Sequence, residues 1–594
     1  MQYKSKSQKS VILILIILFM LGLVVFLLSF VPFDLIKHII DSMSYRGSAN
    51  TEIFNHRVFN IIVIRLRLMG LFFIICSFLL YFIRQKAINM INNIHYDYNL
   101  FKQHIIVIFL EAIKEDGKLY IISLGIISII AIIIRLNYLF QPMRFDEALS
   151  FISYSSKPLF FSLSYYPEPN NHLFNTFLVH ILYLLLGNHP WVIRLPAFFA
   201  GICIIPVSYI VSRIFYNKGA AIMATGLVSS SSILIEYSTN GRGYTLICLF
   251  FLIMVSLTAY LRQERNLAVW LIFCVITSLG FYTIPIMLYP FMTVMFWLTL
   301  CYIYDNKLGI NNIRDIIGFT ILTFILTIIL YIPVIVVNGI DAIIGNIYVK
   351  SMDLSFIIKT LPDSLIELVN LWIRDLPIFI IFLLLIGLFS FIIFYKKYIN
   401  YPLLLFISTI ACLFFAFFVQ RVIPFNRIWM FLLPLYFSFS ALGLSYVVVK
   451  ITKRREKVIS ILLAMLFCSG VYFVILNKSI LYSKETGTLK EAESITLFLK
   501  DRLNSGDSII ASCPSTYIIF YYFNYYGMPL NYFYSNYIVG KMLYVVVNEG
   551  WNQKLNVILM ENQIDINRFK VVLKKKYESA SLIGLSMDNS KEIR

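Results

Sequence analysis

The chain of 594 residues is 59% hydrophobic and 14% charged, with a mean hydropathy of +0.80 and a formal net charge of +19. A soluble globular domain carries about 25% charged residues, so this composition excludes a soluble protein and indicates a polytopic membrane protein. The lysines and arginines fall in short segments between apolar runs, which is the pattern of the positive-inside rule rather than of a nucleic-acid-binding surface. We therefore expect membrane lipids, and no nucleic acid, among the partners.

Apolar runs in chain order predict about 13 membrane-spanning helices, because a span needs ~20 predominantly apolar residues. The runs cover residues 11–30, 60–83, 119–140, 192–214, 219–236, 243–261, 267–283, 284–304, 313–337, 377–395, 402–420, 426–449 and 457–476. With the N-terminus inside, this arrangement places the basic clusters on one side of the membrane. Two long loops, residues 141–191 and 338–376, then lie outside together with the C-terminal segment. The composition is rich in Ile, Asn and Lys, which hints at an AT-rich bacterial genome. The expected location is therefore the cytoplasmic (inner) membrane of a bacterium.

The same patterns divide the chain into three regions. Residues 1–118 form an N-terminal extension with two spans and a cytoplasmic segment, and residues 119–476 form a transmembrane core. In residues 477–594 the charge rises and the apolar runs shorten, which predicts a small extracytoplasmic α/β domain. The elements expected in this domain are an amphipathic helix over residues 489–503 and strands over residues 507–513 and 541–547.

The spacing of the cysteines and glycines matches no metal-binding, disulfide or nucleotide-binding motif. Every cysteine except Cys513 lies in an apolar run, so no spacing indicates a disulfide framework or a metal knuckle. The chain contains neither GxxxxGK[ST] nor GxGxxG, so a nucleotide site is unsupported. No cofactor is certain from these patterns.

Asp146 and Glu147 form an acidic pair just beyond the run over residues 119–140, at its predicted outer end. A carboxylate beside a low-dielectric surface can have a raised pKa, which suits a general base that acts on a hydroxyl group. The alternative is that the pair caps the N-terminus of an interfacial helix, where acidic residues are favoured. The surrounding motifs favour the catalytic interpretation.

Four segments occur in an order that resembles the GT-C glycosyltransferase superfamily, in particular the bacterial relatives of protein O-mannosyltransferases and the lipid A aminoarabinose transferases. The resemblance covers residues 119–475, and it implies that the first two spans are an addition to the core of the family. The segments are RLNYLFQPMRFDEALS (Arg135 to Ser150), NNHLFNTFLVHILYLLLGNHPWVIRLPAFFAGI (Asn170 to Ile202), YSTNGRGYTL (Tyr237 to Leu246) and FNRIWMFLLPLYFSFSALGL (Phe425 to Leu444).

This resemblance implies an all-α polytopic membrane fold and an enzymatic activity. A hexosyl or pentosyl group would pass, with inversion, from a polyprenyl-phosphate donor to a hydroxyl group of an envelope lipid, glycan or protein on the outer face. The chemistry agrees with the position of the acidic pair, because an amphiphilic donor needs a site at the membrane edge.

The resemblance also implies roles for charged residues. Asp146 is the expected base, and Glu147 is expected to orient the acceptor, to support Asp146 or to help hold a divalent cation. Arg194, Arg427 and Arg242 are expected to bind the carrier phosphate, whose negative charge requires cationic partners. The alternative for these arginines is snorkelling to lipid headgroups.

The residues expected on the acceptor side are His172, Asn171, Glu236 and Tyr244. His172 would hydrogen-bond the acceptor or a carboxylate or ligate a metal ion, although a lone histidine is often only a satisfied polar residue. The turn YSTNGRGY departs from many relatives, because Asn240 stands where they carry a carboxylate. Either Glu236 substitutes for that carboxylate or the second acidic role is absent.

The sequence leaves the use of a divalent cation open, because no His/Cys/Asp spacing in the chain specifies a metal site. The residues that could share such an ion are Asp146, Glu147 and His172.

Two other classes of function remain as alternatives. A flippase or transporter of lipid-linked sugars would usually carry charges near mid-span and internal repeats, whereas the acidic pair lies at a span edge. An inactive transferase-like scaffold for envelope assembly is the third hypothesis. Asp146→Asn discriminates among them, because only an enzyme would lose turnover while keeping its fold.

Overall fold

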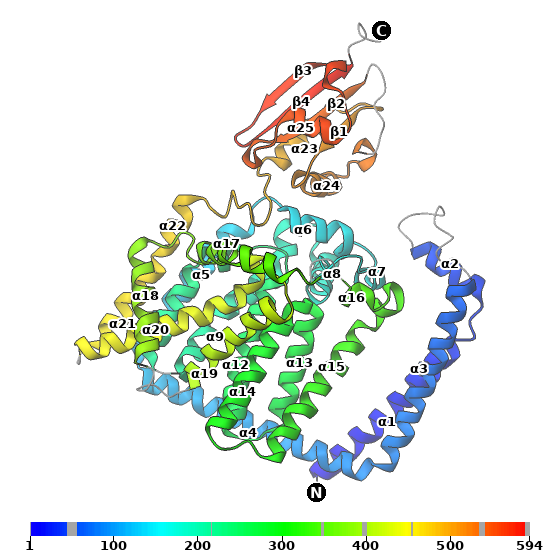
Figure 1. Ribbon diagram of the computed structural model, residues 1–594. Helices are drawn as coiled ribbons and strands as arrows, with labels where there is room; N and C mark the ends of the chain where they lie inside the picture. Colours follow the sequence, from blue (N-terminus) through cyan, green and yellow to red (C-terminus); the bar gives the residue numbers. More distant parts are fainter. Residues whose placement is uncertain are drawn as a thin grey trace. The chain divides into compact units, whose positions relative to one another are not determined.

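The computed structural model describes residues 2–43, 56–215, 217–345, 350–394, 401–452, 455–533 and 541–587. The chain, whose elements are labelled in Figure 1, divides into two compact units. The first comprises Met1–Ala112 with Gln263–Phe273, and the second comprises Ile113–Arg262 with Cys274–Arg594.

The first unit is built on a pair of packed apolar helices. Its helices are α1 (Gln2–Leu28), α2 (Phe33–Met43), α3 (His56–Phe82) and most of α4 (Arg84–Asp116). Gly22 and Gly70 allow α1 and α3 to approach closely, since a Cβ atom on Gly70 would lie 2.7 Å from the backbone nitrogen of Phe26. The carboxylate of Asp97 in α4 accepts a 2.7 Å hydrogen bond from the backbone nitrogen of Leu267, which joins the second segment to this unit.

The rest of the transmembrane region is helical. In chain order its elements are α5 (Lys118–Leu139), α6 (Phe145–Ser150), η2 (Phe151–Ser155), α7 (Leu159–Ser164), α8 (Leu173–Leu186), α9 (Pro190–Phe215), α10 (Lys218–Ser230), α11 (Ser232–Ser238), α12 (Tyr244–Gln263), α13 (Leu267–Thr283), η3 (Pro285–Met287), α14 (Leu288–Tyr304), α15 (Ile310–Asn338), α16 (Asp341–Ile344), α17 (Leu354–Trp372), α18 (Ile378–Ile393), α19 (Tyr401–Phe414), η6 (Phe415–Val419), η7 (Asn426–Leu432), α20 (Leu433–Thr452), α21 (Glu456–Cys468) and α22 (Gly470–Asn477).

Every apolar run predicted to span the membrane is helical in the described part of the chain. Within those residues, 10 helices are long and apolar enough to cross a membrane, or up to 11 if the bent pair α10 and α11 is one span. The two members of this pair meet at an angle of 62°. The predicted fold class, an all-α polytopic membrane protein with a small C-terminal α/β domain, is confirmed.

The C-terminal domain contains a four-stranded sheet of order β1-β2-β4-β3, in which β1 and β2 are parallel and the other pairs are antiparallel. The expected helix and the two expected strands are present as α23, β1 and β2, and the helices α24 and α25 and the strands β3 and β4 are additional. The elements are α23 (Ala492–Lys500), β1 (Ser508–Ala511), α24 (Ser515–Tyr525), η8 (Leu530–Phe533), β2 (Met542–Asn548), η9 (Glu549–Trp551), α25 (Leu555–Glu561), η10 (Ile566–Arg568), β3 (Phe569–Lys576) and β4 (Ala580–Met587).

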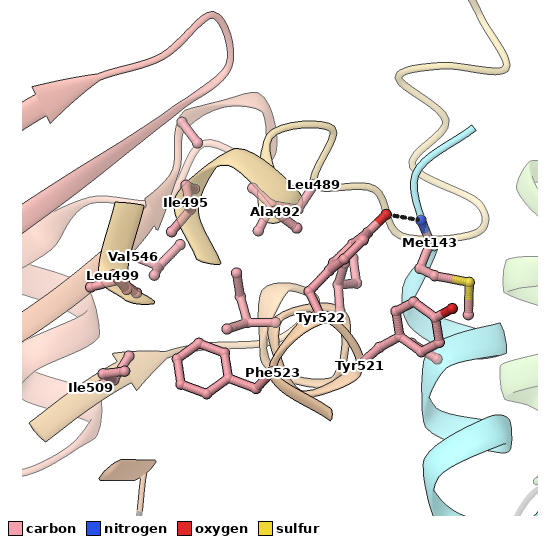
Figure 2. Close-up of a cluster of buried hydrophobic side chains, with 14 of the residues drawn as sticks. Met143, Leu489, Ala492, Ile495, Leu499, Ile509, Tyr521, Tyr522, Phe523 and Val546 are labelled. Atoms are coloured by element: carbon pink, nitrogen blue, oxygen red, sulfur yellow. Dashed lines mark hydrogen bonds between the residues drawn. The ribbon is translucent and has the colours of Figure 1, made fainter. Parts of the chain in front are cut away.

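Both faces of the inner strand β2 are buried. Side chains alternate between the two faces of a strand, so successive residues of β2 enter two different hydrophobic clusters. Tyr544 and Val546 belong to a hydrophobic cluster with α23 and α24, and Leu543 and Val545 belong to a second cluster with α25. The first cluster is shown in Figure 2.

That first cluster continues into the transmembrane region, where Met143, Ala148, Phe151 and Ile193 belong to it. The hydroxyl of Tyr522 in α24 accepts a 3.2 Å hydrogen bond from the backbone nitrogen of Met143 (Figure 2). The aromatic helix α24 thus packs on the segment that carries the acidic pair.

Candidate functional site

The acidic pair lies in the first turn of α6. Glu147 accepts a 2.9 Å hydrogen bond from the backbone nitrogen of Arg144, the residue that precedes the helix. An N–H group at this position has no partner within the helix, so the carboxylate satisfies a donor that the helix leaves open. The capping interpretation of the sequence therefore describes Glu147, whereas Asp146 has different partners.

Glu147 and Arg194 form a buried ion pair in which both side chains are 0% exposed. The Nε of Arg194 donates to both carboxylate oxygens at 3.1 and 3.0 Å, and Nη2 also contacts Oε1. The backbone nitrogen of Gly241 donates to Oε2 at 2.8 Å. Burial opposes ionisation of Glu147, but the charge and hydrogen bonds of Arg194 outweigh burial and hold the pKa below its ordinary value.

The other hydrogen bonds of Arg194 go to backbone carbonyl groups between α5 and α6. Its Nη1 donates to the carbonyl oxygens of Leu139 and Gln141, both at 2.7 Å, and its Nη2 donates to that of Pro142 at 2.8 Å. A guanidinium with every nitrogen bonded and no exposed surface does not fit the predicted role in binding the carrier phosphate. The contacts instead make Arg194 the anchor of the chain between α5 and α6.

Glu236 is also buried and engaged. It is 0% exposed, pairs with Arg374, and accepts a 2.8 Å hydrogen bond from the hydroxyl of Thr486 in the segment that leads to the C-terminal domain. Arg144 donates to the carbonyl oxygens of Glu236 and Thr239 at 3.1 and 3.2 Å. These contacts do not fit the predicted substitution of Glu236 for an acceptor-side carboxylate, because neither of its oxygens is left open to an acceptor.

His172 and Arg242 contact each other in a buried polar cluster. Arg242 donates from Nη1 to the hydroxyl of Ser150 and, at 2.8 Å, to the carbonyl of Asn170. Its Nη2 lies 3.0 Å from Nε2 of His172, whose Nδ1 accepts a 2.9 Å hydrogen bond from the backbone nitrogen of Gly243. Arg242 is only 2% exposed, so the predicted phosphate-binding role does not fit this position either.

The imidazole of His172 is held neutral. Burial lowers its pKa well below the ordinary value, and the nearby charges of Arg242 and Arg427 lower it further. A neutral imidazole carries one N–H, so only one of the two donors that face its ring nitrogens can be accepted at a time. With both nitrogens facing donors, His172 is not arranged to ligate a metal ion.

Asn171, the neighbour of His172 in the chain, makes hydrogen bonds that stabilise the surrounding loop. Its side-chain amide donates to the carbonyl oxygens of Ser162 and Tyr165 at 2.9 and 3.0 Å, and its oxygen accepts from Thr176 at 2.8 Å. These bonds hold the loop between α7 and α8. Asn240 contrasts with it, since both polar atoms of its buried amide have no hydrogen-bond partner among the described residues.

Three of the predicted residues meet at a partly exposed position. The Nη1 of Arg427 lies 3.9 Å from Oδ2 of Asp146, and its Nε donates to the hydroxyl of Tyr244 at 3.0 Å. The side chains of Arg427 and Asp146 are 19% and 17% exposed. Unlike Arg194, Arg427 is within ion-pair distance of a carboxylate without a close hydrogen bond to it, so its guanidinium can receive an anionic ligand.

Glu485 is a fourth member of this group that the sequence analysis did not identify. Its Oε1 lies 3.8 Å from the same Nη1 of Arg427, and its side chain is 24% exposed. Burial raises its pKa, the neighbouring charge of Glu236 raises it further, and Arg427 opposes both effects. No motif could have identified Glu485, because it lies in the connection to the C-terminal domain, remote in sequence from the other members.

The residues suggested for a divalent cation do not come together as a metal site. Within the described ranges, no group of three or more His, Cys, Asp or Glu side chains is placed to hold a metal ion. Glu147 is committed to Arg194, and His172 faces two donors.

Comparison with known proteins identifies the fold. No family model matches the chain, and no curated protein matches its sequence. ArnT from Cupriavidus metallidurans bound to undecaprenyl phosphate superposes with a TM-score of 0.51 at 11% identity, over 77% of this chain and 97% of that chain. The apo state of the same ArnT superposes with a TM-score of 0.51 at 12% identity, over the same shares of the two chains.

The oligosaccharyltransferase of Archaeoglobus fulgidus, in complex with zinc and sulfate, has a TM-score of 0.44 at 14% identity, over 67% of this chain and 61% of that chain. At such identities the likeness to ArnT, a lipid A aminoarabinose transferase, is one of fold. The chain shares the fold of ArnT, which is the kind of fold that its four ordered motifs predict.

Proposed function

We propose that this protein is an integral-membrane glycosyltransferase of the bacterial cytoplasmic membrane. It moves a hexosyl or pentosyl group from a polyprenyl-phosphate donor to a hydroxyl group of an envelope lipid, glycan or protein, on the extracytoplasmic face. One observation carries the proposal: Asp146 and Arg427 lie 3.9 Å apart and partly exposed beside the apolar helices. The shared fold with ArnT, which was crystallised with undecaprenyl phosphate, supports the class of donor.

Asp146 and Arg427 have complementary chemistry. The phosphate of the donor carries negative charge, and Arg427 offers planar N–H donors suited to phosphate oxygens. Asp146 accepts the proton of the acceptor hydroxyl, and the oxygen of that hydroxyl forms a bond to the anomeric carbon of the sugar. The bond from that carbon to the phosphate oxygen breaks, and the electron pair leaves with the polyprenyl phosphate. Attack opposite the leaving group inverts the anomeric centre.

The buried residues position this pair. The ion pair of Glu147 with Arg194 fixes the first turn of α6, and the hydrogen bond from Gly241 ties that turn to the segment before α12. Asp146 immediately precedes Glu147 in the same turn, so its backbone position follows from these contacts. Glu147 and Arg194 are therefore positioning residues.

The proposal keeps the three regions expected from the sequence. The core, residues 119–476, carries Asp146 and Arg427, and the domain within residues 477–594 packs beside them on the extracytoplasmic side. Residues 1–118 are an extension with two spans. Transport of lipid-linked sugars and an inactive scaffold are the competing functions that the experiment below separates.

The experiment uses the full-length protein in nanodiscs with a panel of radiolabelled polyprenyl-phosphate sugars and a crude envelope extract. Wild type is compared with Asp146→Asn and with Asp363→Asn, a matched change at an exposed position of α17. We expect label to reach an acceptor with wild type and Asp363→Asn only. Equal movement of labelled lipid across the bilayer by all three proteins, without transfer, would favour transport and contradict the proposal.

A further inference from the structure

The connection between α22 and the C-terminal domain is held against the candidate site. Asp375, which follows α17, binds Asn477 at 2.9 Å and also Ser479 at the start of this connection. At its other end, the carbonyl of Gly487 accepts a 2.9 Å hydrogen bond from the backbone nitrogen of Phe145 in α6. Thr488 forms a bridge with Arg144. Glu485 thus lies in a segment that is fixed on both sides.

The approach at Gly487 is close enough to require glycine. Its φ is +66°, in the left-handed region that favours glycine, and a Cβ atom there would lie 2.8 Å from Cβ of Phe145 and 3.0 Å from Cβ of Pro514. Thr486 is tied to Glu236 at 2.8 Å. The position of Glu485 relative to Asp146, one residue beyond Phe145, is therefore set by the backbone and by flanking side chains.

Glu485 and Asp146 share one guanidinium. The Nη1 atom of Arg427 lies 3.8 Å from Oε1 of Glu485 and 3.9 Å from Oδ2 of Asp146. The hydroxyl of Tyr237 donates to the same Oε1 at 3.4 Å. When both carboxylates are ionised, the three side chains carry a net charge of one negative unit, which repels a phosphate that approaches Arg427.

The surroundings of Glu485 favour its neutral form. Burial raises the pKa of this carboxyl, and Glu236 in α11 adds to the effect, whereas Arg427 and Arg374 oppose it. Asp146, from α6, faces it across Arg427. A protonated carboxyl removes one negative charge from the site and offers an O–H that can donate to a phosphate oxygen.

We propose that Glu485 is a further residue of the donor site, which shares Arg427 with Asp146 and sets the charge state in which the site accepts the carrier phosphate. The inference rests on the proposed function and adds a residue that the family motifs do not contain. Binding of the carrier is then coupled to the uptake of one proton by Glu485. The neutral isostere, Glu485→Gln, should reproduce the binding-competent state at every pH.

The test measures binding rather than turnover. The probe is the methyl diester of undecaprenyl phosphate, because a phosphodiester keeps a single negative charge across roughly pH 5 to pH 9 and only the protein titrates. Its Kd is measured in nanodiscs for the full-length wild type, Glu485→Gln, Glu485→Asp and Glu561→Gln. Glu561 is an exposed carboxylate at the end of α25 and provides the matched control.

We expect the Kd of wild type and Glu561→Gln to rise with pH, approaching roughly tenfold per pH unit where Glu485 is ionised in the free protein. Glu485→Asp keeps a titratable group and keeps a pH dependence. Glu485→Gln binds tightly with a flat profile. Asp146→Asn is measured in parallel, and the slope that persists in it belongs to Glu485.

The outcomes separate the two proposals. A wild type that binds no probe at any pH contradicts the proposed function itself. A wild type that binds, together with the same pH slope in Glu485→Gln, overturns the role of Glu485 alone. A folded Glu485→Gln that binds nothing at any pH also overturns it, because the neutral side chain should be the competent one.

Discussion

Asp146 and Glu147 are consecutive residues whose carboxylates have different environments. Glu147 is 0% exposed and is bonded to Arg194 and Gly241, whereas Asp146 is 17% exposed and lies 3.9 Å from Arg427. One carboxylate thus holds the helix turn in place, and the other is partly exposed beside Arg427.

Substitutions of these two residues should therefore impair different properties. We expect Asp146→Asn to lower transfer by roughly 10²–10⁴-fold, the usual contribution of a general base, with an unchanged thermal unfolding midpoint. Glu147→Gln should lower the unfolding free energy by about 3–5 kcal/mol, because it leaves the buried guanidinium of Arg194 without a counter-ion. Transfer assays and thermal unfolding of the two purified variants measure both effects. Equal loss of stability in both variants would contradict this division.

The Glu147–Arg194 pair should also make stability depend on acid pH. The pKa of Glu147 in the folded protein is below its ordinary value of 4.5, so the unfolded state binds a proton more readily. The stabilisation is therefore complete above about pH 4.5 and is lost as the pH falls through the lower folded value. Unfolding midpoints measured over this range should fall more steeply for wild type than for Glu147→Gln. Parallel profiles would show that the pair does not contribute.

Arginine-to-lysine substitutions should separate the phosphate-binding residue from the anchor. Arg427→Lys keeps the charge but removes the planar fork, and the loss of charge-assisted hydrogen bonds worth about 1.5–3 kcal/mol should weaken carrier binding roughly 10- to 100-fold. Arg194→Lys should instead lower the unfolding midpoint. Binding of undecaprenyl phosphate and thermal unfolding are measured for both variants, and a stable Arg194→Lys that fails to bind carrier would reverse these assignments.

Gly241 should tolerate no side chain. A Cβ atom there would lie 2.8 Å from Cγ2 of Ile193 and 3.4 Å from Cβ of Glu147, and its backbone nitrogen donates to Glu147. Overpacking of this kind costs about 1–3 kcal/mol. We expect Gly241→Ala to lower both stability and transfer, whereas Gly125→Ala, where no atom lies within 4 Å of the added Cβ, should lower neither.

Cys513 provides a direct test of orientation. It is exposed and lies in the C-terminal domain between β1 and α24. A membrane-impermeant maleimide should label Cys513 in cells whose outer envelope is permeabilised and whose cytoplasmic membrane is intact. The substitution Cys513→Ser should abolish this labelling. Labelling that appears only after the cytoplasmic membrane is disrupted would place the domain inside and contradict the proposed topology.

The arrangement along the chain follows from local properties. Each predicted span depends on a continuous apolar run, and backbone groups in lipid must be paired within the helix, so periodicity and length are sufficient. The C-terminal elements are harder to predict from the sequence, because the aromatic run of α24 has no clear hydrophobic period. The helix α24 also packs on Met143, which lies in a distant part of the chain (Figure 2). The strand β4 pairs with both β2 and β3, and such pairing is not local.

The sequence by itself determined the helical membrane architecture, the small α/β domain and the position of the acidic pair at the end of a span. Only the tertiary structure decided which charged side chains are buried and paired and which stay partly exposed. Arg194, Arg242 and Arg427 look alike as arginines near span ends, yet packing buries the first two and leaves the third partly exposed beside Asp146. Glu485 joins them because the chain folds back after α22. Burial and pairing depend on residues distant in sequence, which no local pattern encodes.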